Sequence, residues 1–192
     1  MTTASPLGKG EVGAPPAAVW VRFLRSYGPT PQNLTMFDEY VSGAVGRAKV
    51  QPIQLATPLL EAMVEHIESK APGSMLIAGT AGDGKTYHCR ALWTRLGGDP
   101  KAWSAKGTVK ELRLEDGRLA VFIKDLSEFN GQESDMPLQR LERSVLGGDD
   151  SEVLVVAANH GQVLDRLRDL GKRQGRRHPL RTPLQECFLQ AG

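Results

Sequence analysis

The chain has 192 residues, 40% of them hydrophobic, which is enough for one well-buried domain with a modest extension. Its 24 Lys and Arg residues nearly balance 22 Asp and Glu residues, so the overall charge does not indicate a nucleic-acid or membrane partner. No run approaches the roughly 18 apolar residues of a membrane span, and the first residues lack the pattern of a secretion signal. The two cysteines, Cys89 and Cys187, lie far apart in sequence, which favours reduced thiols over a zinc or redox pair. We therefore expect a cytoplasmic protein with no membrane partner.

Two N-terminal segments precede the expected domain. Residues 1–16 are rich in Gly, Pro, Ala and Ser and predict a disordered arm, because they carry too little apolar surface to offset the entropy of ordering. Residues 17–51 predict a helical extension, with one helix over 19–27 and another over 34–50. A Gly-Pro-Thr-Pro sequence separates these two helices.

The main domain is expected over residues 52–170. Apolar residues at helical spacing predict a helix over 57–67 that packs on a sheet. The short apolar run over 75–78 is bounded by glycine on both sides and predicts a buried central strand. A second helix is expected over 85–96, where a Gly-Gly-Asp-Pro sequence ends it.

Further strands and helices alternate after this helix. An Asp-Gly turn predicts a hairpin of strands 109–114 and 119–123, of which the second is internal. A helix over 137–146, a buried strand over 153–158 and an amphipathic helix over 162–170 follow. This alternation predicts the α/β class, as a three-layer α/β/α arrangement with a mainly parallel sheet.

Residues 171–192 are expected to form a basic C-terminal tail with one short helix. The basic residues are Lys172, Arg173, Arg176, Arg177, His178 and Arg181. They could contact the phosphates of a nucleic acid, although a solvated surface is the more common role of such a cluster.

A glycine-rich loop joins the strand at 75–78 to the helix at 85–96. It matches the pattern G-x-x-x-x-G-K-[ST] at every specified position. Glycines let successive backbone N–H groups converge on phosphate oxygens at a helix N-terminus. Lys85 is expected to reach the β and γ phosphates, and the Thr86 hydroxyl to bind Mg²⁺. The predicted nucleotide-binding residues are Gly79, Thr80, Ala81, Gly82, Asp83, Gly84, Lys85, Thr86 and Tyr87, with ATP and Mg²⁺ as cofactors. The alternative is a glycine turn that only joins a strand to a helix.

Polar residues follow the next two apolar strands. Asp125 comes directly after the strand at 119–123 and is expected, with Thr86, to hold the metal through water. Glu128 is the candidate base for an attacking water, and Asn159 is placed to orient that water or contact the γ phosphate. Lys85, Glu128 and Asn159 are thus the catalytic candidates. The alternatives are that both acids are solvated loop residues and that Asn159 belongs to a turn.

The order of glycine loop, Asp125 and Asn159 resembles the AAA+ and related STAND branch of P-loop ATPases over about residues 52–170. The resemblance implies a P-loop NTPase-like fold, ATP hydrolysis at the C-terminal edge of the sheet, and an oligomer or larger ATPase complex. It also implies an arginine supplied by a neighbouring subunit, for which the tail arginines, Arg143 and Arg166 are candidates.

A narrower likeness rests on three short segments. Tyr27-Gly-Pro, Met36-Phe-Asp-Glu39 and Gly82-Asp-Gly-Lys-Thr86 resemble bacterial ATPases of phosphorothioate-dependent DNA restriction and similar phage-defence systems. This likeness implies a DNA-linked process driven by ATP.

Two departures from the AAA+ pattern bear on turnover. Leu126 stands where the family carries an acid, and we expect the helical lid that usually follows in the family to be absent or truncated. An Mg²⁺-dependent ATPase that drives an assembly or DNA-linked process is therefore one expectation. A nucleotide-gated interaction module, or a truncated ATPase that binds ATP without hydrolysing it, is the alternative. A small-molecule kinase is a third possibility, ranked last because no arginine-rich lid segment is visible.

Overall fold

The computed structural model describes residues 19–21, 45–46, 57–148 and 151–190. The chain divides into two units, residues 1–55 and 56–192. In the first unit, residues 19–21 and 45–46 are helical, as expected at those positions. The rest of the two predicted N-terminal helices, and the arm predicted over 1–16, lie outside the described residues.

The first half of the second unit contains the glycine loop and its flanking elements. Thr57 accepts a hydrogen bond from the Leu60 backbone N–H at 3.2 Å and Pro58 is the first helical residue, so the predicted helix starts where its cap lies. A short helix that the sequence analysis did not anticipate begins at Pro100, capped by Asp99. The elements are α3 (Pro58–Glu68), β1 (Met75–Gly79), α4 (Lys85–Arg95), α5 (Pro100–Ser104) and β2 (Val109–Arg113).

The second half confirms the remaining predicted helices and strands, with small shifts at their ends. The elements are β3 (Leu119–Ile123), α6 (Asp135–Leu146), β4 (Glu152–Asn159), α7 (His160–Arg173) and α8 (Arg181–Gln190). Two 3₁₀ turns, Leu126–Glu128 and Gly131–Ser134, lie between β3 and α6. None of the described helices is long and apolar enough to cross a bilayer.

The four described strands form one open sheet in the order β1-β4-β3-β2. β1 and β3 both run parallel to β4, and β2 is antiparallel to β3, so the expectation of a mainly parallel sheet is confirmed. Gly79 at the end of β1 pairs with Asn159 at the end of β4. The carboxyl ends of β1, β4 and β3 therefore meet at one edge of the sheet.

The prediction that the strand at 75–78 is central was wrong for the described sheet. β1 pairs only with β4 among the described strands, and its residues before Gly79 are half-buried. Met75 and Ile77 pack on one face of the sheet and Leu76 on the other. Because helices cover both faces, an edge strand here carries the same continuous apolar run as a central one.

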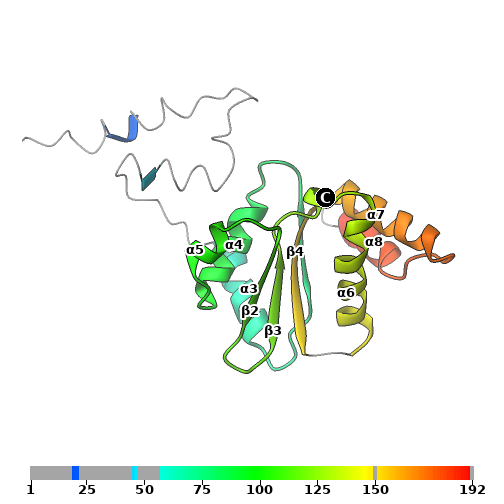
Figure 1. Ribbon diagram of the computed structural model, residues 1–192, viewed down its shortest axis with the longest axis horizontal. Coiled ribbons are helices and arrows are strands. Elements are labelled where there is room, and N and C mark those ends of the chain that lie inside the picture. Colours follow the sequence, from blue (N-terminus) through cyan, green and yellow to red (C-terminus); the bar gives the residue numbers. More distant parts are fainter. Residues whose placement is uncertain (1–18, 22–44, 47–56, 149–150, 191–192) are drawn as a thin grey trace, which may run out of the picture. The chain divides into compact units, whose positions relative to one another are not determined.

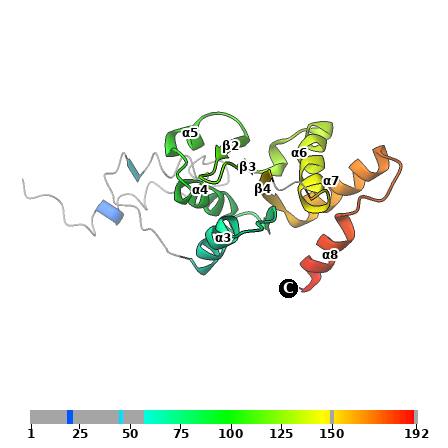
Figure 2. The same ribbon diagram turned by 90° about the horizontal axis from the view of Figure 1, so that it is seen from below.

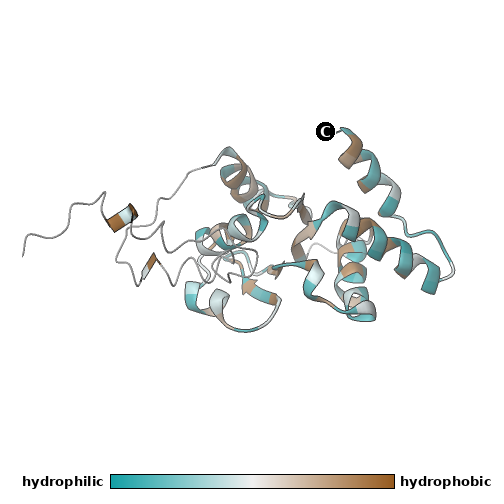
Figure 3. Cartoon of the chain, turned by 90° about the horizontal axis from the view of Figure 1, so that it is seen from above, coloured by the Kyte–Doolittle hydropathy of each residue, from teal (hydrophilic) through white to brown (hydrophobic). Residues whose placement is uncertain are grey.

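Helices cover both faces of the sheet and give three layers (Figures 1 and 2). Alternate residues of β3 and β4 enter two separate cores: Phe122 and Val155 face α3, α4 and α5, whereas Val121 and Val156 face α6 and α7. The rings of Trp93, Trp103 and Phe122 pack against one another in the first core. Figure 3 shows the hydrophobic colouring on the strands and in patches on the helices, as this two-sided burial requires.

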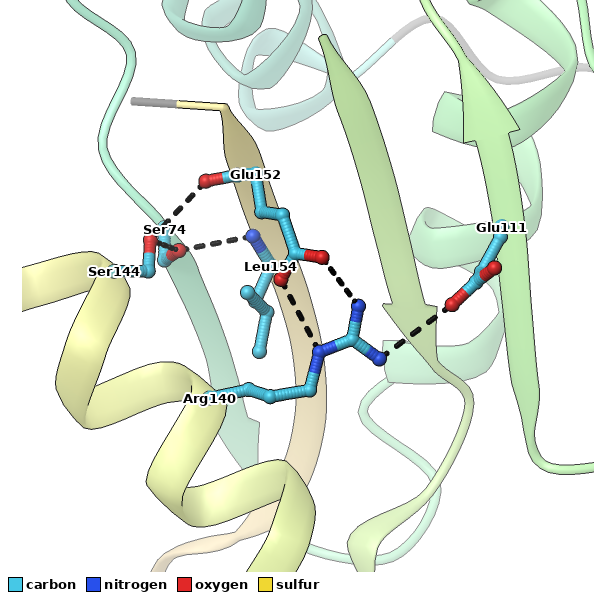
Figure 4. A network of polar contacts seen from close by, with 6 residues as sticks. All are labelled: Ser74, Glu111, Arg140, Ser144, Glu152 and Leu154. Atoms are coloured by element: carbon cyan, nitrogen blue, oxygen red, sulfur yellow. Dashed lines mark hydrogen bonds and ion pairs between the residues drawn. The ribbon is translucent and has the colours of Figure 1, made fainter. Parts of the chain in front are cut away.

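A polar network at the amino end of β4 holds α6 to the sheet (Figure 4). Arg140 of α6 donates two hydrogen bonds to Glu152, at 2.8 and 3.2 Å, and reaches Glu111 of β2 at 3.5 Å. The Ser74 hydroxyl accepts from the Leu154 backbone N–H at 2.9 Å and also contacts the Ser144 hydroxyl. These contacts lie at the sheet edge opposite the glycine loop.

The chain reverses between α7 and α8 through a tight, glycine-dependent turn. Gly175 has φ +65°, its N–H donates to the Lys172 carbonyl at 3.1 Å, and the Arg176 N–H donates to the Gly171 carbonyl at 3.0 Å. This pair of hydrogen bonds is a Schellman motif, which ends helices at a left-handed residue. Leu184 and Phe188 of α8 then pack on the second core, so the described part of the basic segment lies against α7.

Candidate functional site

The glycine loop leaves β1 at Gly79 and enters α4 at Lys85. Gly82 and Gly84 have φ values of +91° and +74°, which residues with a Cβ rarely adopt. Residues 80–83 are exposed to solvent, so their backbone faces outward at the start of a helix. A loop of this form presents N–H groups to an anion, and the helix dipole adds a favourable field there.

Lys85 folds back over the loop. Its ammonium group donates to the Thr80 carbonyl at 2.5 Å, which holds the charge above the loop backbone. The next residue, Thr86, is half-buried on the first turn of α4, and its hydroxyl makes no hydrogen bond to any described residue. The Lys85 ammonium group and the Thr86 hydroxyl oxygen therefore both lie beside the loop, where they are placed to contact a ligand. Tyr87 packs its ring edge against His88, with the Arg90 guanidinium 5.9 Å from the ring centre.

The loop also contains a carboxylate. Asp83 accepts hydrogen bonds from the Thr80 backbone N–H at 2.5 Å and the Thr80 hydroxyl at 3.1 Å. These bonds hold the pKa of Asp83 below its ordinary value, and the charges of Lys85 and His160 add to the effect. The carboxylate lies over Gly79, where an added Cβ would come within 2.6 Å of an Asp83 oxygen. Asp83 is therefore ionised at neutral pH and partly offsets the positive charge of Lys85.

His88, one turn into α4, contacts the glycine loop, and the sequence analysis did not predict this contact. The His88 Nδ1 atom lies 3.0 Å from the Gly84 carbonyl oxygen, and Nε2 lies 3.2 Å from the Thr57 hydroxyl. Because a carbonyl only accepts, Nδ1 donates to Gly84, and in the neutral ring Nε2 accepts from Thr57. His88 thereby ties the end of the glycine loop to the cap of α3. The only sequence signal for this contact is the position of His88 one turn after the glycine loop. Its second partner, Thr57, is 31 residues away in sequence, so the spacing of residues does not reveal the pairing.

Asp125 lies at the carboxyl end of β3, two residues past Ile123, which pairs with Val156 of β4. It caps the 3₁₀ turn by accepting from the Ser127 N–H at 2.8 Å with one carboxylate oxygen. The other oxygen makes no hydrogen bond to the described residues. Asp125 therefore stands at the same sheet edge as the glycine loop with one free oxygen.

Leu126, where the resembled family has an acid, is a core residue. Its side chain is 0% exposed and packs in the second core with Ile123 and Leu138. The chain turns immediately after Asp125, so this position points into the protein rather than along the sheet edge. An ionised side chain here would lose its hydration without a partner.

The predicted catalytic base Glu128 is held away from the loop strand. Its carboxylate accepts a hydrogen bond from the Thr108 hydroxyl at 2.6 Å. Thr108 directly precedes β2, which is the far edge of the sheet from β1. The structure thus joins Glu128 to the β2 side and brings it into no described contact with Lys85 or Thr86.

Asn159 stands opposite Gly79 and caps α7. Its Oδ1 atom accepts from the Gly161 N–H at 3.2 Å, so this residue starts a helix rather than an isolated turn. Since the oxygen serves as the cap, the side-chain NH₂ group is the part left to contact a ligand. Asn159 also lines a hollow of about 550 Å³ along α7, which Asp165 and Asp169 border. This hollow meets the glycine-loop edge only at Asn159.

Of the six arginines considered as partners for a phosphate, Arg166, Arg173 and Arg176 are engaged by other residues of the chain. Arg166 donates to the carbonyls of Phe129 and Gly131 at 2.6 and 3.0 Å and orders the 129–134 segment. Arg173 pairs with Asp135, and Arg176 pairs with Glu142 at 2.6 Å. Arg143 lines a different hollow, near the amino end of β4.

Among the described residues, no three His, Cys, Asp or Glu side chains come together as a metal-binding cluster. A Mg²⁺ ion held mainly by phosphates and water needs only one hydroxyl and one carboxylate from the protein. Thr86 and Asp125 supply these two groups at one sheet edge. The residues present thus fit an Mg²⁺ that arrives with a phosphate ligand, and they do not form a cage for the metal alone.

Comparison of the sequence with protein-family models and with curated proteins found no match.

Proposed function

We propose that this chain is a P-loop nucleotide-binding domain that holds Mg·ATP at residues 79–87. The observation that carries the proposal is the meeting of three parallel strand ends: the glycine loop after β1, Asn159 after β4 and Asp125 after β3. Ligands of open α/β sheets bind outside the carboxyl ends of the strands. A lysine and a threonine at the start of α4 supply what a Mg²⁺-bound phosphate chain requires.

In this proposal each polar group has one task. The loop N–H groups and Lys85 bind the β and γ phosphates, and Lys85 leaves the Thr80 carbonyl to do so. Thr86 and Asp125 would hold the Mg²⁺ ion, which would neutralise part of the phosphate charge when bound. The Asn159 amide donates to the γ phosphate. The choice of ATP over other nucleotides rests on the resemblance to the AAA+ and STAND ATPases.

Isothermal titration calorimetry with Mg·ATP tests the proposal. Lys85→Ala should weaken binding at least about tenfold, because a charge-assisted contact to phosphate contributes roughly 1.5–3 kcal/mol. Lys101→Ala, an exposed lysine outside the loop, is the charge-matched control and should bind as wild type does. Equal affinities of wild type and Lys85→Ala, with both folded by circular dichroism, would remove the glycine loop from the function.

A nucleotide-gated interaction module is favoured over a fast ATPase by two contacts. Leu126 is buried where an acid is expected, and Glu128 is bonded to Thr108. Binding of the γ phosphate would draw Lys85 and Asn159 toward it and bias the ends of α4 and α7, which is a change that a partner or a second copy can read. The DNA-linked process suggested by the narrower resemblance belongs to this proposal as one possible output.

Phosphate release separates the module from the ATPase. The module predicts slow release that Glu128→Gln leaves unchanged. The ATPase predicts that Glu128→Gln abolishes release and spares Mg·ATP binding, and that turnover per molecule rises with protein concentration if a neighbouring subunit completes the site. Thr108→Val is the control, because it removes only the hydroxyl bonded to Glu128 and keeps the carboxylate. It separates loss of the Glu128 charge from a change in the position of the segment that carries Glu128.

A further inference from the structure

A third hollow, of about 360 Å³, lies at the turn between α7 and α8. Five positively charged side chains line it, and no acidic side chain does. They are Arg168, Lys172, Arg176, Arg177 and Arg181. The hollow lies at the C-terminal end of α7, whereas Asn159 caps its N-terminal end; the 14 residues of the helix separate the two by about 20 Å.

The backbone beneath this hollow is fixed in position. The Schellman turn at Gly175 sets the path of residues 174–176. Gly171 lies so close to the next segment that an added Cβ would stand 2.6 Å from the Arg176 carbonyl oxygen and 2.9 Å from the His178 nitrogen. The basic side chains therefore project from an ordered turn and not from a loose tail.

Three of the five charges have acidic partners outside the hollow. Arg168 pairs with Asp165 at 2.9 Å, Lys172 lies 4.0 Å from Asp169, and Arg176 pairs with Glu142 at 2.6 Å. These pairs position the side chains along the rim.

Arg177 and Arg181 have no such partner among the described residues. Neither guanidinium group makes a hydrogen bond or ion pair there, and the Nε atom of Arg181 is buried with no hydrogen bond. A buried donor without an acceptor is unfavourable, because it has lost its hydrogen bonds to water and gained none in return. Such a group in a lined hollow indicates an acceptor that the described residues do not supply.

His178 closes the base of the hollow with a buried ring, 1% exposed. Its Nδ1 atom accepts from the Leu180 N–H at 3.3 Å. Its Nε2 atom lies 3.2 Å from a Glu142 oxygen but makes no hydrogen bond. A carboxylate therefore lies near Nε2, and the Nε atom of Arg181 is the buried donor at the hollow that lacks an acceptor among the described residues.

We propose that this hollow binds a phosphate group, with Arg177 and Arg181 as its direct ligands. Guanidinium groups match phosphate oxygens in geometry and charge, and the lining has no aromatic ring other than the imidazole of His178 on which a base could stack. The phosphate can come from a nucleic-acid backbone or from free phosphate or pyrophosphate. This site is separate from the glycine loop and does not rest on nucleotide binding there.

The test compares Arg177→Gln/Arg181→Gln with Lys70→Gln/Lys101→Gln, which removes the same charge from exposed residues outside the hollow. Fluorescence anisotropy measures binding of a short mixed-sequence DNA duplex over a range of salt without ATP. If a backbone phosphate is the ligand, the arginine variant should bind at least about tenfold more weakly, and its salt slope should fall by about one. The lysine control should change binding less than twofold.

The second arm titrates the labelled full chain with pyrophosphate and follows amide signals by NMR. If free phosphate is the ligand, signals of residues 171–182 should shift in wild type and not in the arginine variant, separately from any shift in residues 79–86. Loss in either arm supports the site and identifies the source. If neither ligand depends on the two arginines, or the lysine control weakens duplex binding equally, the proposal is overturned. Arg177→Gln alone, at an exposed position, covers the case in which the double variant does not fold.

Discussion

At the residue scale, the most informative position is Leu126, which directly follows Asp125. In the resembled family an acid at this place takes part in hydrolysis, yet here the side chain is fully buried in the second core. The second core therefore requires an apolar residue at position 126 and leaves no room for a hydrated acid. Placing an acid at this position should therefore damage the fold and not increase phosphate release.

Leu126→Glu should lower the free energy of unfolding by about 3–5 kcal/mol, because it places a carboxylate in an apolar site without a partner. Leu126→Met, similar in volume, should cost less than about 1.5 kcal/mol. Urea denaturation gives both values, and phosphate release is measured on the same samples. A stable Leu126→Glu variant with increased phosphate release would show that this position faces the site.

Asp83 is the second residue with a distinctive role, because it places a negative charge inside a loop proposed to bind phosphate. Asp83→Asn should tighten Mg·ATP binding by up to about fivefold, because it removes a negative charge close to the proposed phosphate position. Asparagine keeps an oxygen to accept the Thr80 N–H. Because the pKa of Asp83 is lowered, the difference should stay constant from pH 8 to pH 5.

Asp116→Asn is the matched control for this measurement. Asp116 is an exposed carboxylate whose pKa is also lowered, by hydrogen bonds from Arg118, but it lies in the β2–β3 turn. Its replacement should leave Mg·ATP affinity unchanged. Weaker binding by Asp83→Asn would mean that the carboxylate supports the loop more than it repels the ligand.

At the element scale, the junction of α7 and α8 couples stability to pH. Burial lowers the pKa of His178, Arg176 acts in the same direction, and Glu142 opposes them. The neutral ring also accepts the Leu180 N–H at Nδ1, which a protonated ring cannot do. The folded state therefore favours neutral His178 more than the unfolded state does.

This preference gives a defined pH dependence. The stability it contributes is complete above the unfolded pKa of about 6.5 and is lost as the pH falls from there through the lower folded pKa. In that window one proton can account for at most about 1.4 kcal/mol per pH unit. Between pH 7.5 and pH 5 the free energy of unfolding should fall less for His178→Gln than for wild type. Urea denaturation of both proteins at the two pH values measures this difference. Equal losses would show that the ring titrates alike in both states.

At the scale of the whole molecule, most of the main domain could be predicted from its sequence. Helical spacing, the Asp-Gly turn and the Pro and Gly boundaries identified α3, α4, α6 and the β2–β3 hairpin, because these signals are local. The position of β1 at the edge of the described sheet could not be predicted, since strand order depends on pairing between distant segments. α5 was missed because its five residues are too few for a periodic pattern.

The candidate site was predictable to the same extent. The glycine loop is one continuous segment, so its motif could be found directly. The ends of β3 and β4 were found because polar residues follow apolar runs. The Thr57–His88 contact, the burial of Leu126 and the Glu128–Thr108 bond were not predictable, because each depends on which face of a turn meets a segment far away in sequence.

The two cysteines offer a measure of global stability. Cys89 is 0% exposed in the first core, and burial raises its pKa to about 12, whereas Cys187 is exposed on α8. An alkylating reagent at pH 8 should modify Cys187 quickly and Cys89 at least about a thousandfold more slowly, through unfolding. Peptide mass spectrometry distinguishes the two thiols. Comparable rates would show that the first core opens easily.

The proposed function requires that the glycine loop holds the phosphates of Mg·ATP. The most direct measurement is a titration of the ¹⁵N-labelled full chain with Mg·ATP, followed by amide NMR signals. The amides of Gly82 to Thr86 should shift first and farthest, followed by those near Asp125 and Asn159, and Lys85→Ala should lose these shifts at the same ATP concentration. Shifts confined to other parts of the chain, or none in a folded protein, would contradict it.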